Sequence, residues 1–172
     1  MNTATDLVRV GFQNAANAEA VPEAGSFRVW VNSALARVRR SYPADALLTI
    51  RIVSEAESTD LNSSFRNVPR PTNVLAFPVS VSSYPGHAEE VELGDLAICA
   101  AVVEREAAEQ GKPVQAHFAH MAVHGVLHLV GYDHSDDGEA REMEALEQQV
   151  MADLGLPDPY RDENRDNNLR QA

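Results

Sequence analysis

The pattern of apolar and polar positions divides the chain into strand-like and helix-like blocks. Alternating or continuous apolar runs predict strands, which lie at residues 7–13, 46–53, 74–79 and 93–98. Apolar residues at helical spacing predict five helices. Four are long and cover residues 26 to about 40, 100–110, 113–130 and 136 to about 154, and one short helix follows Ser54. The order β-α-β-α-β-β-α-α-α predicts an α+β fold: a single domain with a small mixed four-stranded sheet packed with about five helices.

The helix predicted over residues 113–130 is apolar on almost every side, which is typical of a helix in the middle of a fold. Four histidines fall within an arc of roughly 80° on it: His117, His120, His124 and His128. Burying several imidazoles together is costly unless each finds a polar partner. A metal ion would be such a partner for two or three of them. We therefore expect this helix to be central and to carry a metal site, with His117 partly exposed.

The spacing of three histidines makes the metal prediction specific. His124 and His128 are four residues apart and share one helix face. Gly131 can end the helix at little cost, so the chain can turn and bring His134 back to the same point. Three neutral nitrogen donors with a vacant fourth position are typical of catalytic zinc sites, whereas structural zinc sites usually close with four ligands. We predict one Zn²⁺ per chain, bound by His124, His128 and His134.

Zinc endopeptidases with the motif H-E-x-x-H-x-x-G-x-x-H have the same spacing. There the glutamate after the first histidine is the general base. This chain has Gly125 at that position, and a glycine cannot take a proton from water. A metallopeptidase stays open as an alternative if the base comes from elsewhere, such as Glu139 or Glu142 on the last predicted helix. The missing glutamate favours another hydrolytic chemistry.

Length and composition set the class of protein. The 172 residues suffice for one core and are too few for two comfortable domains. We predict a domain over residues 1–157 and a disordered tail over 158–172, where apolar content is low. No apolar run approaches the ~20 residues of a membrane span, and no signal pattern begins the chain. With a single cysteine, Cys99, these features predict a cytoplasmic protein with no membrane partner.

Charge is distributed unevenly along the chain. The net charge is −12, which by itself argues against a nucleic-acid partner. Residues 1–80 hold eight basic and seven acidic residues, a net of +1, and residues 81–172 hold six and nineteen, a net of −13. All eight basic residues of the first half are arginines, whose planar fork matches phosphate geometry. Arg66 and Arg70 lie in a predicted loop over residues 66–72, which Pro69 and Pro71 stiffen, so we expect this rigid loop to present one of them.

Taken together, these segments resemble the YbeY family of bacterial rRNA-maturation endoribonucleases. The resemblance covers roughly residues 5–157. It rests on Leu61-Asn62-x-x-Phe65-Arg66, on residues 71–78 (PTNVLAFP), on residues 94–98 (GDLAI), on His120-Met121-x-x-His124-Gly125 and on the stretch through His134. Two departures are visible, because Ala76 replaces a typical serine and residues 68–70 replace a more polar, lysine-bearing stretch. The second departure concerns how RNA is held.

The resemblance implies a function and roles for residues. It implies that His124, His128 and His134 bind zinc and that Arg66 is needed for cleavage. It also implies single-strand-preferring cleavage in ribosomal RNA maturation, including processing of the 16S rRNA 3′ end, and a role in small-subunit assembly and quality control. The implied partners are ribosomal RNA, the small ribosomal subunit and its assembly proteins.

The residues themselves suggest a mechanism. Zinc held by neutral imidazoles can lower the pKa of bound water to about 7 and polarise a phosphoryl oxygen. Arg66 is the candidate that stabilises negative charge on that phosphoryl group. His120 is a second catalytic candidate, which would relay a proton or orient a ligand. Asp95 and Asp133 are candidate acceptors for imidazole N–H groups. Water and the 2′-hydroxyl of the RNA both remain possible nucleophiles.

A third function stays open beside the nuclease and the peptidase. The protein would then be a non-catalytic ribosome-assembly factor whose metal is structural. A site with three ligands and a rigid arginine-bearing loop argue against it, because a purely structural metal needs neither feature. Elemental analysis, paired with RNA and casein digestion assays with and without a chelator, would separate these three functions. The end groups of the cleaved RNA would separate water from the 2′-hydroxyl as nucleophile.

Overall fold

The computed structural model describes residues 6–38, 42, 45–79 and 92–161. They form a four-stranded mixed sheet in the order β1-β2-β4-β3. The parallel strands are β1 (Arg9–Asn14), β2 (Leu47–Val53) and β4 (Glu92–Cys99), and β3 (Val74–Pro78) runs antiparallel to β4. The five helices are α1 (Ala24–Ala36), α2 (Glu55–Arg66), α3 (Ala100–Gln110), α4 (Val114–Leu129) and α5 (Asp137–Asp153). The predicted α+β fold and its element order are confirmed.

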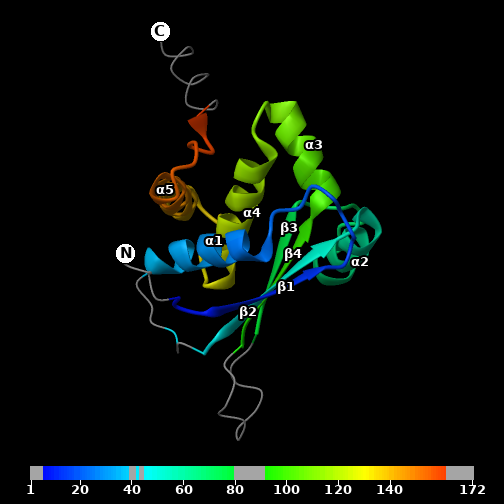
Figure 1. Ribbon diagram of the computed structural model, residues 1–172, viewed down its shortest axis with the longest axis horizontal. Coiled ribbons are helices and arrows are strands. Elements are labelled where there is room, and N and C mark those ends of the chain that lie inside the picture. Colours follow the sequence, from blue (N-terminus) through cyan, green and yellow to red (C-terminus); the bar gives the residue numbers. More distant parts are fainter. Residues whose placement is uncertain (1–5, 39–41, 43–44, 80–91, 162–172) are drawn as a thin grey trace, which may run out of the picture.

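The two faces of the sheet bury different helices. Successive strand residues point to opposite faces, and in β4 Leu96 and Ile98 belong to the large core whereas Ala97 and Cys99 belong to a smaller cluster. Figure 1 shows α1, α4 and α5 on one side of the sheet and α2 on the other. Helix α4 contacts α1, α3, α5, β3 and β4, so the prediction that this helix is central is confirmed.

The ends of two helices differ from the sequence predictions. Ser26 is not the N-cap of α1: the helix begins after Glu23, whose carbonyl already accepts the N–H of Ser26. The helix also ends at Ala36 rather than near Arg40, and Arg40 itself lies outside the described residues. At α2 the predicted cap is confirmed, since Ser54 Oγ accepts the N–H of Glu57 at 3.2 Å. Helix α2 continues through residue 66, because Asn67 ends it at φ 58°.

The end of the described chain is ordered where disorder was predicted. After α5, capped by Asp136 as predicted, residues 158–161 fold back onto the molecule. Pro159 is buried there, although the segment is poor in apolar residues. The disordered tail predicted from residue 158 is therefore wrong for 158–161, and residues 162–172 lie outside the described part. No helix within that described part is both long and apolar enough to cross a membrane.

Candidate metal centre

The C-terminus of α4 is built to reverse the chain. After Leu129 the N–H of Gly131 donates to the carbonyl of His128 at 3.1 Å, and the N–H of Tyr132 donates to the carbonyl of Leu127 at 3.0 Å. These two bonds form a Schellman turn, which needs a residue with positive φ. Gly131 supplies it at φ 106°. The predicted role of Gly131 is thereby confirmed, and the chain turns back toward α4.

This turn brings the three predicted ligands together. His124 and His128 lie one turn apart on α4 with ring centroids separated by 4.7 Å. His134 comes back from the turn, with its ring centroid 5.2 Å from that of His124 and 5.0 Å from that of His128. Each ring offers one nitrogen, and these atoms all lie within 4.8 Å of one another. The first two rings are half-buried and the third is exposed, so solvent reaches the cluster from one side.

Glu147 on α5 holds one of these rings in a defined orientation. Its carboxylate is fully buried and accepts a hydrogen bond from His124 Nδ1 at 2.7 Å. With Nδ1 engaged, Nε2 is the nitrogen that His124 can offer to a metal. A carboxylate behind a ligand histidine fixes its tautomer and raises its basicity, which is a common arrangement at zinc sites.

The protonation states suit a cation. Burial alone would raise the pKa of Glu147, but hydrogen bonds from His120 and His124 together outweigh it and lower this pKa to about 2. Glu147 is therefore a carboxylate at neutral pH. Burial lowers the pKa of His128 below its ordinary value, and the neighbouring rings and Arg66 lower it further. His128 is thus a neutral imidazole at neutral pH, the form that binds metals.

His120 lies one turn before His124 and does not join the three-histidine cluster. Its Nε2 is bonded to the other oxygen of Glu147 at 2.6 Å, and its side chain is buried. Of its two suggested roles, orienting a ligand can act through Glu147, which bonds both His120 and His124.

His117 was expected to be partly exposed, and this prediction is wrong. The residue is only 3% exposed, and its Nε2 contacts Glu106 Oε1 at 3.2 Å. The carboxylate of Glu106 supplies the partner that would otherwise make its burial costly.

Neither suggested aspartate contacts an imidazole through its side chain. Asp95 is exposed on β4. Asp133 accepts the backbone N–H of His134 at 2.7 Å and the hydroxyl of Ser135 at 3.0 Å, so it shapes the turn instead. The acceptor that the sequence analysis missed is Glu147. Its signal was an acid inside the apolar stripe of α5, between Met143 and Met151 at helical spacing.

The charge of Arg66 acts on the histidine cluster, at His128. It is the last residue of α2, not part of the loop, and is exposed. Among the described residues it forms no salt bridge, and its positive charge contributes to lowering the pKa of His128. The loop after it is anchored, as predicted for a rigid platform: Asn62 Nδ2 donates to the carbonyl of Arg70 at 2.8 Å, and Thr72 N donates to Ser58 Oγ at 3.0 Å.

Gly125 faces away from the candidate metal. A Cβ at this position would lie 3.0 Å from Leu96 and 3.1 Å from Val74, so the position points into the sheet and has no room for a glutamate. Of the two other candidate peptidase bases, Glu139 accepts a hydrogen bond from Ser135 Oγ at 2.7 Å. The position that carries the base in zinc endopeptidases is therefore closed in this fold.

Comparison with known proteins identifies the family of the chain. The family model described as endoribonuclease YbeY matches residues 12–155. A Pseudomonas putida protein named endoribonuclease YbeY is 49% identical over 161 residues, 93% of this chain and 98% of the relative. Its Pseudomonas fluorescens namesake is 53% identical over 149 residues, 86% of this chain and 93% of the relative.

A solved structure supports the fold separately. The solution structure of TM1509 from Thermotoga maritima has a TM-score of 0.51 and 22% identity, covering 84% of this chain and 91% of that one. At this identity the match concerns the fold alone. The family match spans most of the chain, including α4 and the turn that follows it. The chain belongs to the endoribonuclease YbeY family.

Proposed function

We propose that this protein is a zinc-dependent endoribonuclease that prefers single-stranded RNA and acts in ribosomal RNA maturation. The observation that carries the metal dependence is the convergence of His124, His128 and His134, whose donor atoms lie within 4.8 Å of one another. Membership of a family named for endoribonuclease activity supports the reaction. Processing of the 16S rRNA 3′ end, and assembly of the small subunit with its assembly proteins, are the cellular tasks that we propose with it.

The donor set fits zinc. Three imidazoles are typical of catalytic zinc sites and suit softer metals better than Mg²⁺ or Ca²⁺, which prefer oxygen ligands. The buried, ionised Glu147 adds negative charge next to the cluster and compensates a cation. Bound zinc would supply Lewis acidity toward a phosphoryl oxygen. We propose one ion per chain.

The chain's own residues have separate roles in cleavage. The three histidines hold the ion at the end of α4, and Glu147 keeps His124 turned toward it. Arg66 has no salt-bridge partner within residues 6–38, 45–79 and 92–161, so its guanidinium can bind a phosphate. Attack on phosphorus places negative charge on the equatorial oxygens, which a positioned cation stabilises. We propose that Arg66 does this and that His120 acts indirectly, by holding Glu147.

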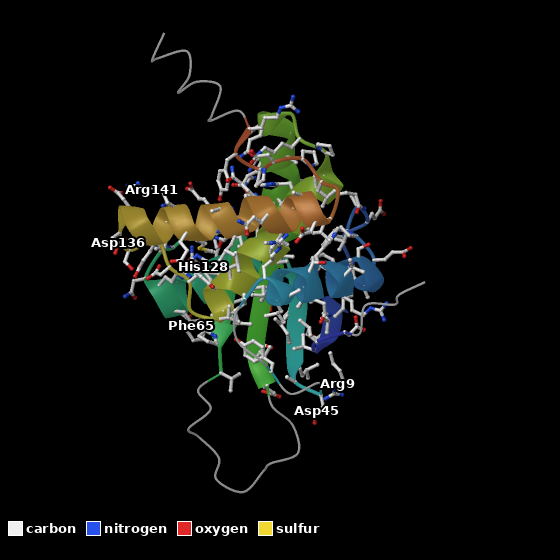
Figure 2. The ribbon with its side chains drawn as sticks, turned by 90° about the vertical axis from the view of Figure 1, so that its left-hand side faces the viewer. Arg9, Asp45, Phe65, His128, Asp136 and Arg141 are labelled. Atoms are coloured by element: carbon white, nitrogen blue, oxygen red, sulfur yellow. The ribbon has the colours of Figure 1, made fainter. Side chains whose placement is uncertain are left out.

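An exposed aromatic ring beside Arg66 accounts for the preference for unpaired RNA. Phe65 is 67% exposed, yet its ring is steadied by an edge contact with Phe77, at 5.0 Å between centroids. In Figure 2, Phe65 and His128 lie along the same edge of the molecule. Unpaired bases stack on such rings, whereas bases inside a duplex cannot reach them. Phe65 is therefore our candidate for binding the base next to the cleaved phosphate.

We expect Phe65→Ala to weaken binding of single-stranded RNA by about 5- to 150-fold, since stacking of one base contributes about 1–3 kcal/mol. The Michaelis constant for a single-stranded oligonucleotide should rise with it, while zinc content stays unchanged. Val29→Ala is the matched control, because Val29 is also an exposed apolar residue (49%) but lies on α1. Equal Michaelis constants for Phe65→Ala and the wild type would remove Phe65 from RNA binding.

Charge bears on how the protein finds its substrate. With a net charge of −12, the chain as a whole repels RNA, and the contacts that its arginines make with phosphates are weakened by salt. We therefore propose that proteins of the small ribosomal subunit and its assembly factors supply much of the targeting. A cytoplasmic location follows from this role.

Two other functions compete with this one. A metallopeptidase needs a general base, and the closed position of Gly125 removes the usual one. A non-catalytic assembly factor would fit the proposed task in small-subunit assembly, but it leaves Arg66 and the solvent-facing side of the histidine cluster without a purpose.

We expect purified protein to contain one zinc per chain by elemental analysis and to cleave single-stranded RNA but not casein. A chelator should abolish cleavage, and added zinc should restore it, because the ion supplies the Lewis acid. Cleavage that survives complete metal removal would refute metal dependence. Casein digestion would instead support the peptidase, and metal-loaded protein without either activity would support the assembly factor.

A further inference from the structure

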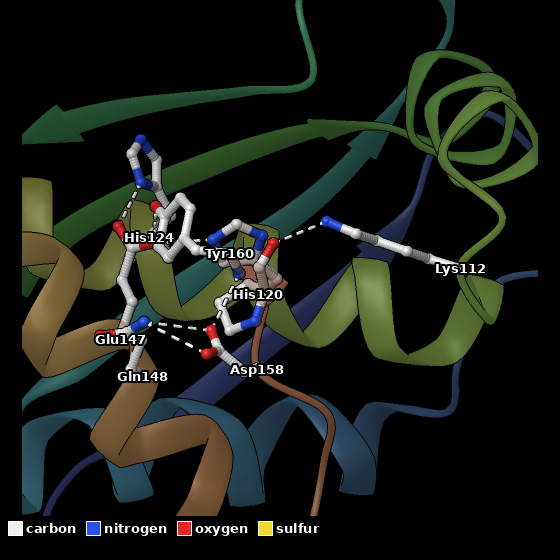
Figure 3. A network of polar contacts seen from close by, with 8 residues as sticks. Lys112, His120, His124, Glu147, Gln148, Asp158 and Tyr160 are labelled. Carbon is white, nitrogen blue, oxygen red and sulfur yellow. Dashed lines mark hydrogen bonds and ion pairs between the residues drawn. The ribbon is translucent and has the colours of Figure 1, made fainter. Parts of the chain in front are cut away.

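The segment after α5 is fastened to the back of the metal centre. Lys112 Nζ donates to the carbonyl of Pro159 at 2.7 Å, and Gln148 Nε2 donates to the carboxylate of Asp158 at 3.2 Å. Asp158 in turn accepts the backbone N–H of Tyr160 at 2.9 Å. Figure 3 shows the contacts of the segment with Lys112, which precedes α4, and with Gln148 on α5. The segment is thus held at several points although it has little apolar surface.

The side chain that these contacts place is Tyr160. Its hydroxyl donates a hydrogen bond to Glu147 Oε2, and its ring meets that of His120 edge-on, with centroids 5.5 Å apart. Glu147 therefore receives three donors: His124 on Oε1, and His120 and Tyr160 on Oε2. A buried carboxylate with three donors is fixed in one orientation, because any rotation would break a hydrogen bond at a buried position.

We propose that Tyr160 is a positioning residue of the metal centre, acting through Glu147 on the ligand His124. This inference rests on the proposed metal centre. The hydroxyl of Tyr160 and the ring of His120 fix one oxygen of Glu147, so the other oxygen faces His124 Nδ1 and Nε2 is presented to the ion. The chain beyond α5 thereby completes a site whose ligands all precede α5.

The same residues do not form a second metal site. His120, His124 and Glu147 have ligand atoms within 4.8 Å of one another, so an ion between them must be considered. Two donors bound to one tetrahedral zinc at about 2.0–2.1 Å lie about 3.3 Å apart. The separations found here are 2.6 and 2.7 Å, which are those of charge-assisted hydrogen bonds. The cluster supports the three-histidine site instead of competing with it.

The test measures zinc affinity, independently of RNA cleavage. Metal-free full-length protein is titrated with Zn²⁺ in competition with a chromophoric chelator, and the visible spectrum of the Co²⁺-loaded form is recorded. We expect Tyr160→Phe to bind Zn²⁺ about 10-fold more weakly than the wild type, the lower end of the range for outer residues at metal sites. The Co²⁺ spectrum should shift, because His124 is less strictly oriented, while the melting temperature of the metal-free protein changes little.

Two further variants sharpen the result. Glu147→Gln should weaken Zn²⁺ binding more than Tyr160→Phe, because an amide has only one acceptor oxygen for two imidazoles. Tyr42→Phe is the control for loss of a hydroxyl, since Tyr42 packs against the core and is not among the donors to Glu147. Its Zn²⁺ affinity should equal that of the wild type. Because Tyr160→Phe removes a single oxygen, it keeps the test valid even if the buried Glu147→Gln protein fails to fold.

The outcomes separate this proposal from the function beneath it. Unchanged Zn²⁺ affinity and an unchanged Co²⁺ spectrum in Tyr160→Phe, with wild-type protein that binds zinc and cleaves RNA, would overturn the role of Tyr160 alone. Two zinc ions per wild-type chain would also overturn it, because Glu147 would then be a ligand. Wild-type protein without affinity for Zn²⁺ would overturn both the metal centre and this inference.

Discussion

Arg66→Ala should abolish RNA cleavage, by at least about 100-fold, while leaving zinc content and melting temperature nearly unchanged. The side chain is exposed at the end of α2 and forms no salt bridge within the described part of the chain, so little stability depends on it. Its charge nevertheless acts on His128. The measurement is single-turnover cleavage of a labelled oligonucleotide, beside elemental analysis and thermal unfolding of the same samples.

Two variants control for charge and for geometry. Arg28→Ala removes another exposed arginine, on α1, where its guanidinium lies 3.7 Å from the carboxylate of Asp6, and should leave cleavage intact. Arg66→Lys keeps the charge but loses the planar fork, so we expect partial activity if Arg66 binds a phosphate through two bonds. Cleavage by Arg66→Ala at the wild-type rate would exclude Arg66 from the reaction.

His128→Ala should lose both zinc and activity. This ring contributes one of the three converging nitrogens, and its neighbours cannot replace it: His120 is bonded to Glu147 and lies outside the cluster. Two remaining imidazoles form an incomplete site, since catalytic zinc sites have three protein ligands. Elemental analysis after dialysis and the RNA assay measure the two losses in one preparation.

The control lies on the same helix. His117→Ala also removes a buried imidazole from α4, about three turns earlier, and breaks a contact with Glu106. This variant should lose stability yet keep stoichiometric zinc. Full zinc content in His128→Ala would show that the ligand assignment is mistaken, whatever the stability of either protein.

The fold could be predicted because its strongest signals are local. Helix α4 is apolar on nearly all sides and ends at a glycine, so its bounds and its central position follow from the sequence alone. The end of α2 could not be predicted in the same way. Only Ser58 and Asn62 on that helix are buried, so it shows no apolar stripe that marks its length. The predicted loop therefore begins at Arg66, which is the last residue of the helix in the structure.

The candidate site also has a part that local sequence predicts and a part that it does not. The three histidines are close in sequence, and helix geometry with one turn brings them together. Glu147 lies on another helix, and a sequence does not tell which faces of two helices meet. Its position among Met143, Val150 and Met151 indicates a buried acid. The sequence does not indicate which residue is its hydrogen-bond partner.

The ordered residues after α5 were missed for another reason. Sequence analysis measures apolar content, which is low there, whereas the segment is held by hydrogen bonds to Lys112, Gln148 and Glu147. Polar contacts of this kind depend on the finished packing of α4 and α5. They leave no periodic pattern that could be read in advance.

The ligands are divided between a rigid and an exposed part of the chain. Two histidines are fixed on a core helix, and the third follows a turn that is open to solvent. An ion joining them would staple this turn, and the start of α5 after it, to the core. Zinc supply would then govern local order as well as chemistry, because a ligand that binds only the closed arrangement stabilises it by mass action. Without zinc, this turn and the start of α5 would be less ordered, while the rest of the protein stays folded.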